Sequence, residues 1–218
     1  MARARALRRE TAAHPRMGER LREARQARSL SLRDLAERVG VSPSLISQFE
    51  TGRARPSVNT LYALAAELEV SLDDLAFDDQ DLPIPAIVRV PSPAGAIVVR
   101  GEPVQRATDR QRIRLASGVV WERLTTISEP ETEFLYVTYE VGGASSPSDA
   151  FQRHTGLEWG YVLSGTLRVN IGFEEYHLGP GDAITFDSAA PHRLSNDGSG
   201  PVHAVWFVLG RRSAEPPG

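Results

Sequence analysis

The chain has 218 residues, of which 41% are hydrophobic and 24% charged, and its formal net charge is −3. These values are ordinary for a globular protein and exclude wholesale disorder, and the length suggests one large domain or two small ones. Because the chain has no cysteine, no apolar run of about 18 residues and no secretory signal, we expect a cytoplasmic protein without disulfides, thiolate metal sites or a membrane span.

The charges are divided unevenly along the chain. Residues 1–70 carry 13 arginines against 8 acidic residues, whereas residues 71–218 carry 12 arginines against 20 acidic residues, and there is no lysine anywhere. An excess of positive charge in the N-terminal part favours an anionic partner for that part. The sequence therefore indicates two parts with different functions and excludes lysine chemistry.

The N-terminal part is predicted to be helical. Residues 1–16 form a basic arm that we expect to be disordered, and after it the apolar residues recur at helical spacing. Ser31 with Asp34 three positions later is a capping signal, Ser42 followed by Pro43 is another, and Gly40 is placed to end a helix. Five short helices are expected, at about residues 17–28, 32–39, 43–51, 57–69 and 72–77.

The remainder of the chain changes character twice. Residues 78–96 contain four prolines, so we predict an extended linker without a regular element. From residue 97 to 212 the apolar period falls to two, with Ser164-Gly165 placed as a hairpin turn, which favours an antiparallel sandwich or barrel; residues 213–218 form a tail. One predicted strand places four side chains on one face: Leu135, Val137, Tyr139 and Val141. The aromatic residues expected to fill the interior are Trp121, Phe134, Tyr136, Tyr161, Phe186, Trp206 and Phe207.

The second and third predicted helices are joined by a three-residue turn, Gly40-Val41-Ser42, which is the geometry of a helix-turn-helix. In that motif the second helix enters the DNA major groove with its N-terminal residues against base edges, where Gln pairs well with adenine. Two arginines that follow the helix are placed to meet phosphates. The predicted DNA-binding residues are Ser42, Pro43, Ser44, Ser47, Gln48, Arg53 and Arg55. The same helices would also suit a packing or dimerisation module.

The stretch SLRDLAERVGVSPSLISQFE (residues 31–50), followed by Thr51-Gly52, closely resembles the phage-repressor-like DNA-binding domains of the XRE type. The resemblance covers residues 17–77 and implies a five-helix domain that binds double-stranded DNA. It also implies an ion pair between an arginine of the first helix, Arg25, and the glutamate that ends the recognition helix, Glu50.

A second group of residues lies in the strand region. His154, Glu158 and His192 are two imidazoles and a carboxylate, the set that holds Fe(II), Mn(II) or a similar divalent metal and leaves positions open for a ligand. Gln152 belongs to the same pattern but is a poor transition-metal ligand. The alternative is that His154 and Glu158 hydrogen-bond to each other in a pocket that binds an organic effector without metal. His14, His177 and His203 have no partners at ligand spacing.

These residues resemble the two motifs of the cupin family, over residues 110–212. His154, Glu158 and Gly165 match the first motif, and Pro180, His192 and Asn196 match the second, although Gln152 stands where the first motif has its first histidine. The resemblance implies a C-terminal antiparallel β-barrel, the double-stranded β-helix, and thus an α + β two-domain chain. It implies an effector pocket at Gln152, His154, Glu158 and His192, with metal (Fe, Mn, Ni or Zn) on the last three.

Two functions remain open. An XRE-type domain joined to a cupin is the architecture of a transcriptional regulator that senses a small-molecule effector and is not an enzyme. Such a regulator is expected to bind a pseudo-palindromic operator as a homodimer, because one small helical domain makes few base contacts and cupins usually dimerise through their sheets. The alternative is a non-haem metal oxygenase, since hydroxypropylphosphonate epoxidase has a similar layout. In that family a lysine of the helical domain helps to hold the phosphonate, and this chain has no lysine.

Overall fold

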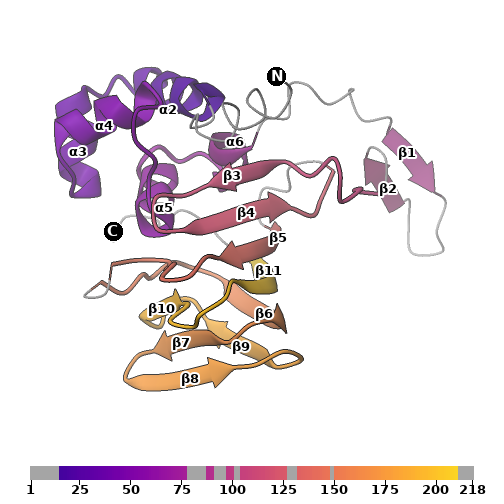
Figure 1. Ribbon diagram of the computed structural model, residues 1–218. Helices are drawn as coiled ribbons and strands as arrows, with labels where there is room; N and C mark the ends of the chain where they lie inside the picture. The colour runs from indigo at the N-terminus through magenta and orange to yellow at the C-terminus, as the bar shows by residue number, and fades with distance from the viewer. Residues whose placement is uncertain are drawn as a thin grey trace, which may run out of the picture.

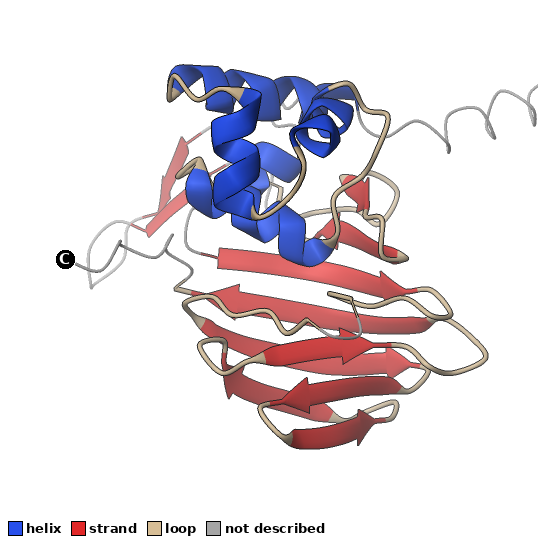
Figure 2. Cartoon of the chain, turned by 90° about the vertical axis from the view of Figure 1, so that its left-hand side faces the viewer, coloured by secondary structure: helices blue, strands red, loops and turns tan. Residues whose placement is uncertain are grey.

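The computed structural model describes residues 15–77, 87–90, 97–100, 104–126, 132–147 and 150–210. The predicted basic arm lies outside the described residues up to position 14, and the predicted tail 213–218 lies wholly outside them. A helical part and a β part are stacked, with the helices covering one end of the sheets (Figures 1 and 2). None of the helices described is long and apolar enough to cross a membrane.

The five predicted helices are confirmed within one or two residues: α2 (Pro15–Ala27), α3 (Leu32–Val39), α4 (Pro43–Glu50), α5 (Val58–Glu67) and α6 (Leu72–Ala76). Local signals begin and end them. Ser31 and Asp34 form a reciprocal capping box at α3, which ends at Gly40 with a left-handed φ of 75°. Ser42 caps α4, whose first residue is Pro43, so α3 and α4 have the predicted helix-turn-helix connection.

A buried ion pair fixes α4 against α2. Arg25 Nε lies 2.6 Å from Glu50 Oε1 and Arg25 Nη2 lies 3.0 Å from Glu50 Oε2, so the contact is bidentate. The third guanidinium nitrogen donates to the Leu30 carbonyl oxygen at 2.8 Å. The pair implied by the sequence resemblance is therefore confirmed, and it ties the end of the recognition helix to the helix that precedes the motif.

Within the described residues, the β part has nine strands: β3 (Arg112–Arg114), β4 (Val119–Arg123), β5 (Thr132–Tyr139), β6 (Leu157–Ser164), β7 (Leu167–Ile171), β8 (Glu174–Leu178), β9 (Ala183–Asp187), β10 (His192–Ser195) and β11 (Val202–Leu209). They form two antiparallel sheets, of order β3-β4-β5-β11-β6-β9 and β10-β7-β8. The sheets face each other around a core of inward-facing aliphatic and aromatic residues (Figure 2). The cupin fold is confirmed, in the form of an open sandwich.

Two predictions about connections are wrong. The segment predicted as a linker without regular structure contains β1 (Ile87–Val90), which pairs with β2 (Ile97–Arg100) as an antiparallel ladder. The prolines flank this short apolar run and do not interrupt it. Ser164-Gly165 does not close a hairpin, because β6 pairs with β9 and β11 whereas β7 pairs with β8 and β10. The turn instead carries the chain from one sheet to the other.

Several aromatic residues lie on the outer face of the larger sheet and not in its interior. Trp121, Phe186 and Trp206 are buried as predicted. Phe134, Tyr136, Tyr161 and Phe207 have the opposite strand parity to the buried positions, so they point outward. Val141, predicted to share the inward face of β5, lies beyond the end of that strand and is 59% exposed.

The helical part contacts the β part through α5 and α6. The Asn59 amide donates to the Ser145 carbonyl oxygen at 3.2 Å, and the Ala116 amide donates to the Pro56 carbonyl oxygen at 3.0 Å. Next to these backbone bonds, Asp73 of α6 and Arg123 of β4 form an ion pair that is almost completely buried. Buried polar groups are costly unless each is paired in good geometry, so these contacts favour one relative placement of the helical part and the β part. The two parts are therefore docked against each other and not only tethered.

Candidate functional site

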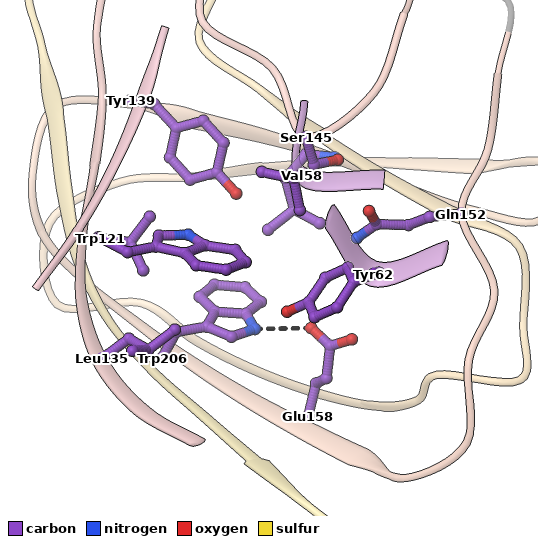
Figure 3. Close-up of a pocket in the computed structure, with 11 residues that line it drawn as sticks. Val58, Tyr62, Trp121, Leu135, Tyr139, Ser145, Gln152, Glu158 and Trp206 are labelled. Atoms are coloured by element: carbon purple, nitrogen blue, oxygen red, sulfur yellow. Dashed lines mark hydrogen bonds between the residues drawn. The ribbon is translucent and has the colours of Figure 1, made fainter. Parts of the chain in front are cut away.

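A small cavity lies between the larger sheet and α5 (Figure 3). Its volume is about 20 Å³, which is room for about one water molecule. Most of its walls are strands of the larger sheet, and the rest come from α5, from β10 of the smaller sheet and from the connection between β5 and β6. The residues that line it are Val58, Tyr62, Trp121, Leu135, Val137, Tyr139, Ser145, Gln152, Glu158, Leu194 and Trp206.

Beside this cavity the structure brings together the three predicted metal ligands. His154 precedes β6, Glu158 lies on β6 and His192 begins β10, so the two sheets bring them together. Glu158 Oε1 lies 2.9 Å from His154 Nε2 and 3.3 Å from His192 Nε2. One ligand atom of each of the three residues lies within 4.8 Å of the ligand atoms of the other two. The structure therefore brings the three predicted ligands close together.

The hydrogen bonds of the two imidazoles assign their tautomers. His154 Nδ1 lies 3.0 Å from the Thr155 carbonyl oxygen, and His192 Nδ1 lies 2.9 Å from the Ala190 carbonyl oxygen. A carbonyl only accepts, so each Nδ1 carries a proton, and each Nε2 faces Glu158 Oε1. An Nε2 that also carries a proton donates to the carboxylate, whereas an Nε2 without one presents a lone pair to a cation. The donor set therefore fits a bound divalent metal.

The carboxylate is fixed in place by two further donors. Ser188 Oγ donates to Glu158 Oε1 at 3.0 Å, and the indole Nε1 of Trp206 donates to Glu158 Oε2 at 2.6 Å (Figure 3). Burial alone would raise the pKa of Glu158, but the contacts with His154 and His192 outweigh it and hold this pKa well below the ordinary value. Glu158 is therefore an oriented carboxylate anion, as a metal ligand must be.

Gln152, where the cupin motif has a histidine, contacts the same group. Its Nε2 lies 2.9 Å from His192 Nε2, and its Oε1 is buried without a hydrogen-bond partner. An amide nitrogen only donates, so this contact is a hydrogen bond when His192 Nε2 carries a lone pair. A 180° turn of the amide exchanges its nitrogen and oxygen, so this side chain can cap His192 or turn an oxygen towards a cation.

The other histidines lie apart from this group. His177 contacts Glu175 at 3.0 Å on exposed β8, and His203 contacts Thr138 at 3.1 Å on the outer face of the larger sheet. His14 lies outside the described residues. Among the described residues, neither His177 nor His203 belongs to the group that could hold a metal ion.

The predicted DNA-binding residues lie along one polar surface of the helix-turn-helix. Ser42, Pro43, Ser44 and Gln48 are exposed on α4, whereas Ile46 and Phe49 on its opposite side are buried. Gln48 Nε2 donates to Ser44 Oγ at 3.3 Å, which is a weak contact that base recognition can replace. Ser47 and Arg55 are half-buried, and Arg53 is exposed just after the helix.

Sequence reasoning missed two features of the site: the cavity wall that α5 supplies and the donors to Glu158 that come from β11 and from the end of β9. Val58 and Tyr62 belong to the DNA-binding domain yet line the cavity, and Ser188 and Trp206 hold Glu158 from 30 and 48 positions away. Helical periodicity marks only the core face of α5. Trp206 was predicted as a filler of the interior, and nothing in its local pattern indicates the hydrogen bond.

Comparison with known proteins agrees with the two halves of the structure. A helix-turn-helix family model matches residues 21–75, and a cupin-domain family model matches residues 135–208. The chain is 28% identical over 185 residues to the HTH-type transcriptional regulator PuuR of Escherichia coli. This alignment covers 84% of this chain and 89% of PuuR.

Two solved structures can be compared with it. A helix-turn-helix transcriptional regulator from Vibrio cholerae superposes with a TM-score of 0.60 at 19% identity, over 92% of this chain and 96% of the other, and so shows a common fold. Hydroxypropylphosphonic acid epoxidase from S. wedmorenis reaches a TM-score of 0.43 at 20% identity, over 91% and 99%, which is too low to argue for a shared reaction. The chain thus joins a helix-turn-helix domain to a C-terminal cupin domain and is similar to HTH-type transcriptional regulators.

Proposed function

We propose that this regulator recognises a specific operator through α4 and responds to a small molecule bound in the cupin domain. The polar, uncharged and exposed surface around Ser44 and Gln48 carries the first half of the proposal. Small hydroxyl and amide side chains suit base edges, and the arginine just beyond the helix suits a phosphate. Ser42, Pro43 and Ser47 complete the base-facing surface, and Arg55 supports Arg53 at the backbone.

Substitutions at Gln48 and Arg53 test the DNA-binding surface. With an operator selected from a pool of random duplexes, Gln48→Ala is expected to cost about 1–3 kcal/mol and to relax the preference at one base position, as loss of a bidentate base contact would. Arg53→Ala is expected to weaken binding to all sequences alike. It should also reduce the slope of the logarithm of the binding constant against the logarithm of the salt concentration by about one. Binding isotherms at several salt concentrations measure both effects.

Arg106→Ala is the matched control for Arg53, because Arg106 is an exposed arginine of the β part. It removes the same charge far from α4 and should leave operator affinity and salt dependence unchanged. If Gln48→Ala retains full discrimination between operator and mutated operators, Gln48 does not contact a base and the assignment of that residue is wrong.

The cupin domain is proposed to hold one divalent transition metal, Fe, Mn, Ni or Zn, on His154, Glu158 and His192. The support is the convergence of two imidazole Nε2 atoms and a carboxylate oxygen, each oriented by a second hydrogen bond. A metal bound there would supply a Lewis-acidic centre for an oxygen- or nitrogen-bearing effector. Around it, Gln152 and the aromatic lining of the cavity would set the shape and polarity of the effector that fits.

A homodimer formed through the larger sheet completes the proposal. The outer face of β5, β11 and β6 carries two cross-strand rows of apolar residues, Phe134–Phe207–Trp159 and Tyr136–Val205–Tyr161. One face of an antiparallel sheet normally meets water with polar residues, so a contiguous aromatic face marks an interface. A second copy of the chain is the occupant that an operator with two half-sites requires.

The oxygenase alternative has less support. None of the residues that line the cavity in the described part of the chain is basic, so nothing in that lining would hold a phosphonate, and the chain has no lysine. We therefore propose a sensor and not an enzyme.

A further inference from the structure

The wall of the cupin cavity that faces the helices belongs to the DNA-binding domain. Val58 and Tyr62, one turn apart on α5, are its only lining residues from outside the β part within the described chain, and Val58 is almost completely buried. The Tyr62 ring lies 5.1 Å from the His154 ring and 5.5 Å from the Trp121 ring, measured between centroids (Figure 3). The helical domain therefore contacts both the cavity and the candidate metal centre directly.

Two polar contacts join α5 itself to the β part, next to the Asp73–Arg123 ion pair of α6 and β4. Tyr62 Oη donates to Glu133 Oε2 at 3.0 Å, and the Asn59 amide donates to the Ser145 carbonyl oxygen at 3.2 Å. The strand residues of the wall lie in continuous ladders such as β4–β5 and β5–β11, and Ser145 and Gln152 lie in the connection between β5 and β6. Among these walls, α5 is the one that a movement of the helical domain would displace.

The cavity is too small for an organic effector as it stands. Room for about one water molecule is less than any organic molecule of several heavy atoms needs. Interiors are close-packed, so an effector cannot enter without displacing a wall. Leu61 and Leu64 of α5 are fully buried in the core of the helical domain, so α5 cannot shift far without carrying α3 and α4 along.

We propose that α5 is a movable wall of the effector site: Val58 and Tyr62 contact the effector, and its admission displaces α5 together with the DNA-reading helix. This inference rests on the proposed regulator function. Filling the cavity and repositioning α4 are then one event, and no signal needs to pass through the segment between the two domains. By thermodynamic linkage, operator binding must in turn change how often the cavity opens.

The absence of cysteine from the chain allows a direct test with the full-length protein. In Val137→Cys the thiol replaces a side chain that lines the cavity, so iodoacetamide reaches it only when the cavity admits a small organic molecule. Val169→Cys is the matched control, because Val169 is completely buried in the smaller sheet and does not line the cavity. Labelling at position 169 reports opening of the β part itself. Leu135→Cys replaces Val137→Cys if that variant does not fold.

Adding Tyr62→Phe to each cysteine variant removes one hydrogen bond to a carboxylate and loosens the wall. Labelling at position 137 should accelerate about tenfold and labelling at position 169 should not change. A saturating operator duplex should change the rate at position 137 by at least about fivefold in either direction, whereas a scrambled duplex should not. Tyr62→Phe should also shift the operator Kd, and Tyr176→Phe, an exposed tyrosine of β8, should not.

Two results would overturn the inference: equal labelling at position 137 with and without Tyr62→Phe, or acceleration at positions 137 and 169 alike. The first would mean that α5 is not the wall that yields, and the second that the β part opens as a whole. An unchanged rate in the presence of operator would remove the link to DNA reading. If no operator is obtained, the proposed function fails, and the Tyr62→Phe comparison still decides whether α5 is a movable wall.

Discussion

His154→Ala is expected to abolish metal binding by the cupin domain. The substitution removes one of three strong ligands and leaves Glu158 facing a single imidazole, so the affinity for divalent metal should fall by at least about a hundredfold. Metal binding to the folded state stabilises that state by linkage, so added Mn(II), Fe(II), Ni(II) or Zn(II) should raise the Tm of the wild type and not that of the variant. Elemental analysis after dialysis and melting curves with and without EDTA measure both effects.

Two controls separate loss of a ligand from loss of structure. His177→Ala removes an exposed histidine that lies apart from the site and should retain metal. Trp206→Phe keeps a smaller aromatic ring at this position but removes the donor to Glu158 Oε2, so it should weaken metal binding about 10–100-fold without abolishing it. The metal proposal is excluded if the wild type contains no metal and none of the four metals changes its Tm. The remaining explanation is then an organic effector held by the His154–Glu158 pair.

The helical half was predictable because its signals are local. The serine caps, Pro43 at the start of α4 and Gly40 after α3 act over three or four positions, and the structure uses each of them as expected. The Arg25–Glu50 pair joins residues 25 positions apart, and only the family resemblance pointed to it. Local chemistry thus predicts the elements, and the resemblance adds one long-range contact between them.

The β half was predictable in class and not in detail. The motif resemblance placed His154, Glu158 and His192 in one site, and the structure does bring them together. The hydrogen bond from Trp206 to Glu158 depends on the register of β6 against β11, which is not encoded in any short segment. The same lack of register information placed Phe207 and Tyr136 in the interior, although strand parity puts them on the outer face.

That outer face leads to the second large effect: Phe207→Glu should convert the protein to a monomer. Phe207 sits at the centre of the row that joins Phe134 and Trp159, with ring centroids 6.0 Å and 5.5 Å away. In a two-fold dimer the substitution occurs twice, removing two aromatic anchors and placing two carboxylates in an apolar interface. We expect the dimer dissociation constant to rise by about a thousandfold or more.

Phe173→Glu is the matched control, since Phe173 is a fully exposed phenylalanine in the turn between β7 and β8, away from this face. Sedimentation at micromolar concentration should give a dimer for the wild type and Phe173→Glu and a monomer for Phe207→Glu. A monomer retains one reading helix, so it should lose affinity for a pseudo-palindromic operator whose half-sites are about 34–36 Å apart while its α4 stays intact. A wild type that sediments as a monomer, or a fragment ending at Phe77 that still dimerises, would exclude this interface.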